Sequence, residues 1–187
     1  KVLKLSKTGQ GNEISLKNSK LDINENDYRY VSIETKIKMS SEKHENQFSI
    51  PYIKDSKGKT AYTLYADGDW SSYKSHVNGK NTLEAGKISV DKWQDIRMDI
   101  DLKEDTFRVT IDGECELAGV NARAKTDNLS EISFYADSWN TGTIYIDSVE
   151  VTAEKERTQS ATFYVSNNGD DSKAGTSQET AWKSLDK

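Results

Sequence analysis

Apolar and polar side chains alternate along much of this chain, and this alternation limits the fold more than any other feature. In YVSIETKIKM, the apolar residues Val31, Ile33 and Ile37 are separated by polar or charged residues. The segments DIRMDIDL and FRVTID repeat the scheme. Successive side chains of a strand point to opposite faces, so a period of two indicates strands with one buried face.

Further strands are expected in QFSIPYI, AYTLYA, EISFYA and TIYIDSVEV, which are separated by stretches rich in Gly, Asn, Ser and Asp. Hairpin connections are indicated at residues 103–105 and at Asp112-Gly113. No window holds a sustained apolar stripe of helical period. Many short strands with turns between them predict an all-β fold, an antiparallel two-sheet β-sandwich (jelly roll) with a short C-terminal extension. Pro51 within QFSIPYI predicts an edge strand or a bulge.

The pattern also predicts how the chain is divided. Residues 1–152 form the expected sandwich, and the polar segment AEKERTQS at 153–160 is the expected linker. Residues 161–187 begin a new pattern, with apolar residues between turn residues.

Composition excludes several classes of function. The 187 residues carry a net charge of −5 without a concentrated basic face, so we expect no nucleic-acid partner. No apolar run approaches the roughly 20 residues that span a bilayer, so we expect no membrane anchor. The single cysteine, Cys115, lacks the spaced partners of a zinc site. No signal peptide precedes Lys1, which leaves a cytoplasmic protein or a piece of a secreted one. Of these we expect the second, an extracellular protein.

The final segment, TFYVSNNGDDSKAGTSQETAWKSLDK, resembles the first coil of the right-handed parallel β-helix in pectate-lyase-like polysaccharide enzymes. The matching residues are Tyr164-Val165-Ser166, Gly169-Asp170-Asp171, Gly175-Thr176 and Trp182-Lys183-Ser184-Leu185. A β-helix coil cannot bury its own apolar side and needs further coils stacked on it. The resemblance implies that residues 161–187 are the truncated start of a β-helix domain. It also implies that the sandwich is an accessory module tethered to a C-terminal catalytic domain.

The segments KWQDIRMDIDLKEDTFRVTIDGE and TGTIYIDSVEV resemble parts of the laminin-G and concanavalin-A-like sandwiches that accompany polysaccharide enzymes. The closing strand is also similar to galactose-binding-like jelly rolls of carbohydrate-binding modules, which is the second hypothesis for the fold. An Asp at this place holds a structural calcium in those jelly rolls, so this resemblance implies a calcium site with Asp147 and Glu13 as ligands. The alternative for Asp147 is a solvent-facing strand residue.

Two segments, TLYADGDWSSYKSH and SFYADSWNTG, combine aromatic rings with carboxylates. Aromatic faces cover the apolar C–H side of a pyranose, and planar polar groups bond its hydroxyls. The candidate ligand-binding residues are Tyr65, Asp67, Asp69, Trp70, Tyr73, Arg97, Tyr135, Asp137, Trp139 and Asn140. Strand phase directs Tyr135 and Arg97 outward, where they could form the floor of a sugar groove. The alternative is that Trp70 and Trp139 close the open ends of the sandwich.

Strand phase also sorts three other residues. Tyr52 and Tyr62 are in phase with core positions and are expected to be buried. His76 is expected to be an ordinary surface residue.

These features favour a non-catalytic carbohydrate-binding module. It would bind polysaccharide as a monomer and hold an appended β-helix lyase or hydrolase near its substrate. A structural spacer sandwich without a ligand is the alternative from another class. A sandwich-fold polysaccharide lyase is the third hypothesis, and it needs a Tyr, a His and an Arg or Gln on one sheet. For that chemistry the sequence offers His76 near Tyr65 and Tyr73.

Overall fold

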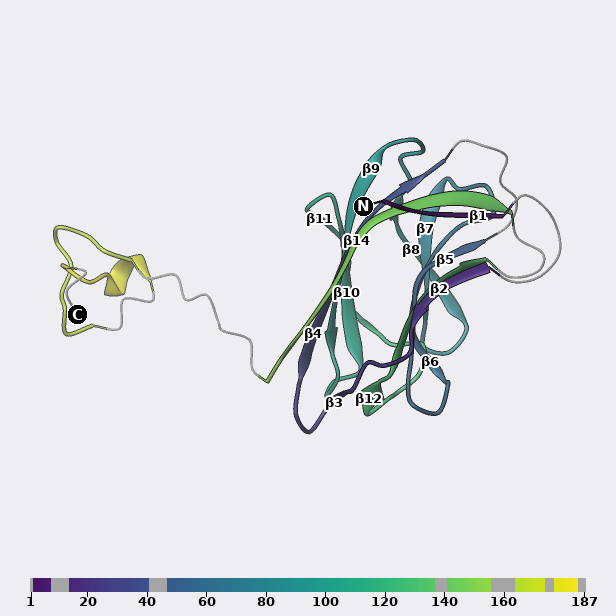
Figure 1. Cartoon of the computed structure of the whole chain (residues 1–187). Helices are drawn as coiled ribbons and strands as arrows, with labels where there is room; N and C mark the ends of the chain where they lie inside the picture. Colours follow the sequence, from purple (N-terminus) through teal and green to yellow (C-terminus); the bar gives the residue numbers. More distant parts are fainter. Residues whose placement is uncertain are drawn as a thin grey trace. The chain divides into compact units, whose positions relative to one another are not determined.

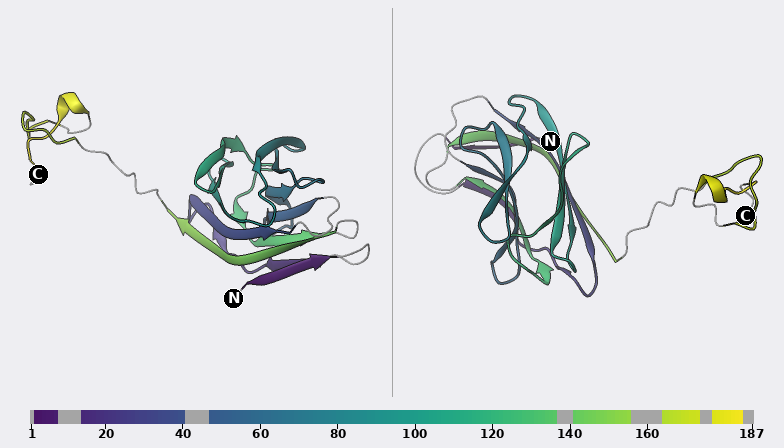
Figure 2. Two further views of the ribbon diagram at one scale, coloured as in Figure 1. Left: turned by 90° about the horizontal axis from the view of Figure 1, so that it is seen from above. Right: turned by 180° about the vertical axis from the view of Figure 1, so that it is seen from behind.

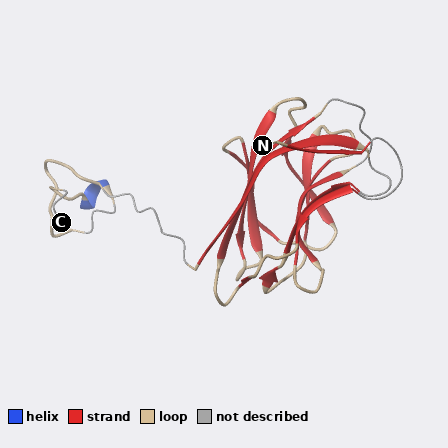
Figure 3. Cartoon of the chain, in the orientation of Figure 1, coloured by secondary structure: helices blue, strands red, loops and turns tan. Residues whose placement is uncertain are grey.

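The computed structural model describes residues 2–7, 14–40, 47–136, 141–155, 164–173 and 177–184. The chain forms two compact units, Lys1–Glu156 and Arg157–Lys187. In Figure 3 the first unit is built of strands, whereas the second consists of loops and a short helical turn.

Within the described residues, the first unit contains two six-stranded antiparallel sheets that lie face to face (Figures 1 and 2). The first sheet has the order β1 (Leu3–Lys7), β14 (Gly142–Glu154), β4 (Tyr30–Met39), β9 (Trp93–Asp101), β10 (Thr106–Ile111) and β11 (Glu114–Asn121). The second has the order β2 (Ile14–Asn18), β13 (Glu131–Ala136), β5 (Phe48–Lys54), β6 (Thr60–Ala66), β7 (Ser72–Val77) and β8 (Asn81–Lys87). The short strands β3 (Ile23–Asn24) and β12 (Asn128–Leu129) pair with each other. The predicted all-β sandwich is confirmed.

The alternation in the sequence becomes the inner and outer faces of the first sheet. In β4, Val31, Ile33, Thr35 and Ile37 are almost fully buried, and Ser32, Glu34 and Lys36 between them are more exposed. Their partners on β9 follow the same phase, with Ile33 opposite Met98 and Val31 opposite Ile100. Burying one apolar face of each sheet against the other removes that surface from water, which is the main favourable term in folding.

Large rings fill the space between the sheets. Tyr62 of β6 packs edge-to-face on Phe107 of β10, with ring centroids 5.7 Å apart. The Tyr73 hydroxyl of β7 donates a hydrogen bond of 2.9 Å to Gln94 Oε1 of β9. Gln94 is itself buried and also accepts a hydrogen bond from the Ser89 backbone N–H at 2.8 Å. A polar network therefore joins the two sheets inside an otherwise apolar core.

Pro51 lies in β5, between β13 and β6, and not on an edge strand. The strand pairing shifts register on both sides of it, between Ser49 and Tyr52 toward β6 and between Ser133 and Tyr135 toward β13. Proline has no backbone N–H for the ladder, so a bulge is how a central strand accommodates it. The bulge alternative is therefore the correct one.

The first two strands of this unit in sequence pair with its last two. β1 pairs with β14, placing Leu3 opposite Ile146. β2 pairs with β13, placing Leu16 opposite Phe134. β14 continues to Glu154, beyond the predicted limit of the sandwich at residue 152. A shift in its pairing with β4 falls between Ile146 and Ser148.

Hydrogen bonds within the C-terminal unit connect the beginning and the end of its described part. Val165 and Trp182 form a parallel bridge, in which the Ser166 N–H donates to Trp182 O and the Trp182 N–H donates to Tyr164 O, both at 2.8 Å. Asp171 accepts hydrogen bonds from the N–H groups of Lys183 and Ser184 at 2.7 and 2.9 Å. The predicted truncated β-helix coil at residues 161–187 stays a prediction.

Candidate functional site

The outer face of the second sheet carries polar and aromatic side chains where its inner face carries apolar ones. Outward positions pair across β13, β5, β6 and β7. One cross-strand row contains Tyr135, Ser49, Tyr65 and Lys74. The next row contains Ser133, Tyr52, Thr63 and His76, the last joined by its backbone N–H to Thr63 Oγ1 at 2.9 Å.

Two aromatic pairs lie in these rows. Tyr52 meets Tyr135 edge-to-face, with centroids 5.3 Å apart and an angle of 88° between the rings. Tyr65 lies against His76, with centroids 4.8 Å apart. Tyr52 and Tyr65 are 8% and 2% exposed, whereas Tyr135 and His76 are half-buried. Each accessible ring is thus supported by a buried one, which fixes its orientation.

Arg123 brings a positive charge to this group. Its backbone N–H donates to Ala61 O at 2.9 Å, which anchors the segment after β11 beside β6. Its charge acts on both Tyr52 and His76. Among the described residues no carboxylate forms an ion pair with its half-buried guanidinium. We refer to Tyr52, Tyr65, His76, Arg123 and Tyr135 as the tyrosine–histidine face.

Burial sets the protonation states on this face. Burial raises the pKa of Tyr52 to about 12, and the charge of Arg123 opposes this only in part. Burial, and then the charge of Arg123, lower the pKa of His76 below its ordinary value. His76 is therefore neutral at pH 7, and its Nδ1 lies 3.3 Å from Thr82 Oγ1. The face presents hydroxyls, a neutral imidazole and one guanidinium, which are groups that bond sugar hydroxyls and carboxylates.

The expectation that Trp70 is an exposed sugar platform is wrong. Its side chain is 1% exposed and packs edge-to-face on Phe48, with centroids 6.2 Å apart. The turn after β6 causes this, because the Trp70 N–H donates to Asp67 O and Trp70 adopts a left-handed φ of 57°. That conformation directs the ring back between the sheets. Of the two hypotheses for Trp70, the one in which it closes the sandwich is correct.

Tyr73 and Tyr65 are not exposed either. Tyr73 points inward to Gln94, because SYKSHV forms strand β7 and Tyr73 falls on its buried face. Tyr65 lies on the outer face but beneath His76, with 2% of its surface exposed. Neither ring is available to stack on a sugar.

The two predicted carboxylates of this segment organise the turn. Asp67 pairs with Lys74 and accepts a hydrogen bond from the Gly68 N–H. Asp69 accepts one from the Ser71 N–H at 2.9 Å, and hydrogen bonds from Ser71 lower the pKa of its carboxyl group. These contacts give both side chains a structural role.

Arg97 and Tyr135 do not form one groove. Arg97 lies on β9 of the first sheet and Tyr135 on β13 of the second, and both face away from the core. Arg97 donates to Glu34 Oε1 at 2.7 Å and pairs with Asp99 at 2.9 Å, so its charge is already neutralised. It lines a polar depression of ≈ 300 Å³ on the first sheet. Phase within single strands was correct, but it did not reveal which sheet each strand joins.

Four predicted residues, Asp137, Trp139, Asn140 and Glu13, lie outside the described residues. Asp147 is exposed at the register shift of β14, as its solvent-facing alternative expects. In the described ranges no three acidic, histidine or cysteine side chains group as a metal site would require. Calcium binding stays a prediction. No helix in the described part of the chain is both long and apolar enough to cross a bilayer.

The sequence interpretation missed Tyr52 and Arg123 as members of the face, and it named His76 only for the lyase hypothesis. Tyr52 is buried as expected, but the bulge at Pro51 turns it to the outer side, where it pairs with Ser133. Arg123 lies in an irregular segment without a period. The alternation in SYKSHV was the available signal for His76, since it puts Lys74 and His76 on one side and Tyr73 on the other.

No family model and no curated protein matches the chain. Several solved structures share its fold. A sialidase matches with a TM-score of 0.66 and 11% identity over 81% of this chain and 15% of its own. The carbohydrate esterase from the Shiga toxin-encoding bacteriophage phi24B has a TM-score of 0.58 and 13% identity, covering 82% of this chain and 81% of its own. Alginate lyase AlyC3 has a TM-score of 0.57 and 10% identity, covering 81% and 74%. The chain therefore has a sandwich fold that these carbohydrate-active proteins also contain.

Proposed function

We propose that the sandwich is a carbohydrate-binding module and that it binds polysaccharide across the tyrosine–histidine face. The observation that carries the proposal is the presence of two half-buried rings, Tyr135 and His76, each held by a buried tyrosine, beside Arg123, whose guanidinium forms no ion pair within the described residues. Rings fixed in this way lose little side-chain entropy when a sugar lies against them. A planar guanidinium matches a carboxylate with two parallel hydrogen bonds, which favours a uronate-containing polymer.

The spacing on the sheet suits an extended ligand. Tyr135 lies on β13 and His76 on β7, with β5 and β6 between them. Neighbouring strands are about 4.8 Å apart, so the two rings lie on strands about 14 Å apart. A polysaccharide strand lying across the sheet would contact both, whereas a single sugar would contact one. We therefore expect polymers to bind more strongly than monosaccharides.

One comparison agrees with a module inside a larger protein, because the chain spans only 15% of the matching sialidase, whereas it spans 81% of the esterase and 74% of the alginate lyase. Together with the β-helix resemblance of the C-terminal unit, this favours a secreted, monomeric module tethered to a C-terminal catalytic domain. Tethering raises the effective concentration of substrate at the enzyme without a new contact.

Affinity electrophoresis tests the proposal. The whole chain is run in native gels that contain a uronate polymer or a neutral glucan. We expect retardation by the uronate polymer that is weakened by Tyr135→Ala, His76→Asn and Arg123→Gln. Arg108→Gln is the matched control, since Arg108 is exposed on β10 of the other sheet. Unchanged mobility in every glycan would reject the proposal and favour the spacer hypothesis.

A second candidate function is polysaccharide lyase activity on the same face. The observation that favours it is that tyrosines, a histidine and an arginine share one sheet face, as this chemistry requires. A base would remove the proton next to the uronate carboxylate while Arg123 neutralises that carboxylate, and a double bond would form as the glycosidic oxygen leaves with a proton. Ultraviolet absorbance of unsaturated products decides between the two. If the glycan retards the chain in the gel but no ultraviolet absorbance of unsaturated products develops, the face binds the polysaccharide without cleaving it.

A further inference from the structure

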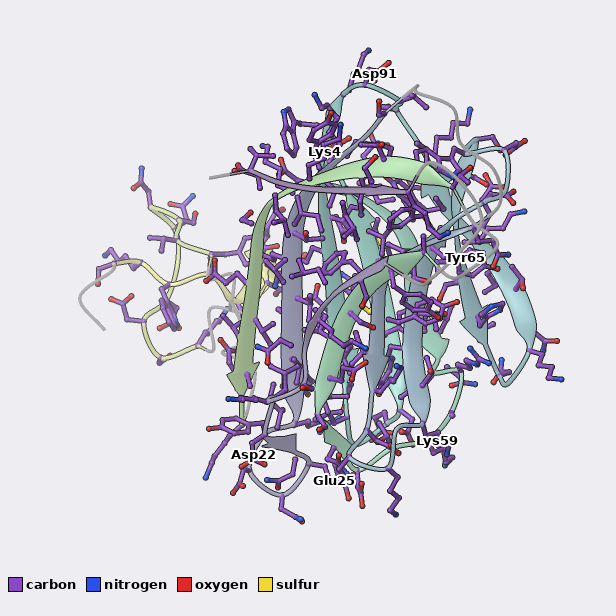
Figure 4. All side chains as sticks on the ribbon, turned by 45° about the vertical axis from the view of Figure 1, so that its right-hand side comes forward. Lys4, Asp22, Glu25, Lys59, Tyr65 and Asp91 are labelled. Atoms are coloured by element: carbon purple, nitrogen blue, oxygen red, sulfur yellow. The ribbon has the colours of Figure 1, made fainter. Side chains whose placement is uncertain are left out.

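A row of alternating lysines and aromatic residues crosses the outer face of the first sheet. Strand register places Lys4 opposite Tyr145, Tyr145 opposite Lys38, and Lys38 opposite Trp93. The four residues come from β1, β14, β4 and β9, which are neighbours in that order. Figure 4 labels Lys4 on the thin N-terminal strand. We refer to these four residues as the lysine–aromatic row.

The ammonium groups lie over the rings. Lys38 Nζ is 4.7 Å from the centre of the Tyr145 ring and 5.6 Å from that of Trp93. Lys4 Nζ is 5.7 Å from the same Tyr145 ring. Cation–π attraction holds each ammonium near a ring, so the positions of the charges are restricted.

The two lysines of the row form no ion pair with a carboxylate within the described residues, although the chain has a net charge of −5. Asp95 of the same sheet pairs instead with Lys36 at 3.2 Å. Two like charges around one ring repel each other unless an anion neutralises them. The arrangement therefore attracts an anionic group.

An aromatic surface is accessible beside the charges. Trp93 is 38% exposed, in contrast to the buried Trp70. Trp93 is the first residue of β9. The neighbouring strand β10 ends at Ile111, which is opposite Ile96, so among the described strands none continues the row beyond Trp93. An exposed indole next to a fixed ammonium combines a surface for the C–H side of a pyranose with a partner for its acidic substituent.

We propose that the lysine–aromatic row is a second binding surface, separate from the tyrosine–histidine face, for a polysaccharide that carries carboxylate or sulfate groups. The acidic group sits between Lys4 and Lys38, and a neighbouring sugar lies against Trp93. The two binding surfaces lie on opposite sheets of the sandwich, so each can contact a different strand of the polymer.

Variants on the first sheet test this surface directly. The whole chain is run in gels with polygalacturonate, and Trp93→Ala and Lys38→Gln are compared with wild type. Each is expected to weaken binding about fivefold, which is roughly 1 kcal/mol at 25 °C. Lys36→Gln is the matched control, because it removes a lysine from the same strand face that is already paired with Asp95. It is expected to leave mobility unchanged.

The outcomes separate this surface from the first one. Loss of retardation only in the Trp93 and Lys38 variants supports the row and rejects the tyrosine–histidine face. Loss only in the Tyr135, His76 and Arg123 variants overturns the row, and partial loss in both sets supports two surfaces. Wild-type mobility that polygalacturonate does not change also overturns the row. So does equal retardation by single-stranded DNA, since that would show binding to any polyanion. A lower melting temperature of Trp93→Ala without a change in retardation would assign the row to sheet stability alone.

Discussion

Replacing Trp70 by alanine tests whether this residue belongs to the core or to a sugar site. The side chain is 1% exposed and contacts Phe48, so the substitution removes a large buried ring from the space between the sheets. Such changes lower the free energy of unfolding by about 3–5 kcal/mol. The total for a domain is about 5–15 kcal/mol, so a large share of the stability would be lost.

The backbone at Trp70 adds a second, sharper expectation. Its φ of 57° lies in the left-handed region, where a side chain with a Cβ costs about 1–2 kcal/mol and glycine has no such cost. Ordering glycine on folding costs about 0.5–1 kcal/mol more than ordering alanine, because glycine has more conformational entropy in the unfolded chain. Trp70→Gly should therefore be milder than Trp70→Ala by about 0.5 kcal/mol, whereas glycine is the worse choice at most strand positions.

Urea unfolding followed by far-ultraviolet circular dichroism measures both variants without relying on tryptophan emission. Trp93→Ala is the control, because Trp93 is exposed and its loss should change the free energy of unfolding by less than about 1 kcal/mol. If Trp70→Ala unfolds at the wild-type midpoint with an unchanged slope and loses glycan binding, the ring belongs to a sugar site and the core assignment is wrong.

Three further predictions concern other parts of the chain. Tyr62→Phe should raise the free energy of unfolding by about 1 kcal/mol, because the buried Tyr62 hydroxyl has no hydrogen-bond partner in the described structure. Tyr73→Phe should lower it by about 1 kcal/mol, because it breaks the hydrogen bond to Gln94, so the urea midpoints of the two variants should shift in opposite directions. The pKa of His76 is lowered in the folded state, so below about pH 6.5 the unfolded state binds more protons and the stability falls as the pH falls. Between pH 8 and pH 5 the melting temperature of His76→Asn should therefore decline less than that of the wild type. Gly169→Ala should disrupt the C-terminal unit, because the new Cβ would lie 2.1 Å from Trp182 O, and faster proteolysis near residue 169 without a change in the sandwich transition would reveal it.

The sequence predicted strands well where their side chains alternate strictly. The predicted segment YVSIETKIKM coincides with β4, because its inward positions are apolar except for Thr35 and the alternation runs unbroken along the strand. Prediction was harder around Pro51, where the shift in register moves Tyr52 from the inner to the outer side of β5. A break in the alternation of this kind depends on how the strand hydrogen-bonds to the strands on both sides of it. The sequence of one strand does not contain that information.

The candidate site was only partly predictable for a related reason. Tyr135 was correctly expected to face outward, but its neighbours were not identified, because Tyr52 and Arg123 reach the same face from distant segments. Trp70 was misplaced because it was grouped with the aromatic and acidic residues of TLYADGDWSSYKSH, and a single left-handed residue reverses the direction of its ring. Pairing partners and turn conformations decide such cases, and neither can be read from periodicity.

The pairing of β1 with β14 and of β2 with β13 has a consequence for synthesis of the chain. Leu3 is opposite Ile146 and Leu16 is opposite Phe134, so β1 and β2 leave the ribosome well before β14 and β13, their partners in the sandwich. At about 5–20 residues per second, the delay is on the order of 7–30 s. During that interval the hairpins of β5, β6, β7 and β8 can already form, while the N-terminal strands stay available to other chains and to chaperones.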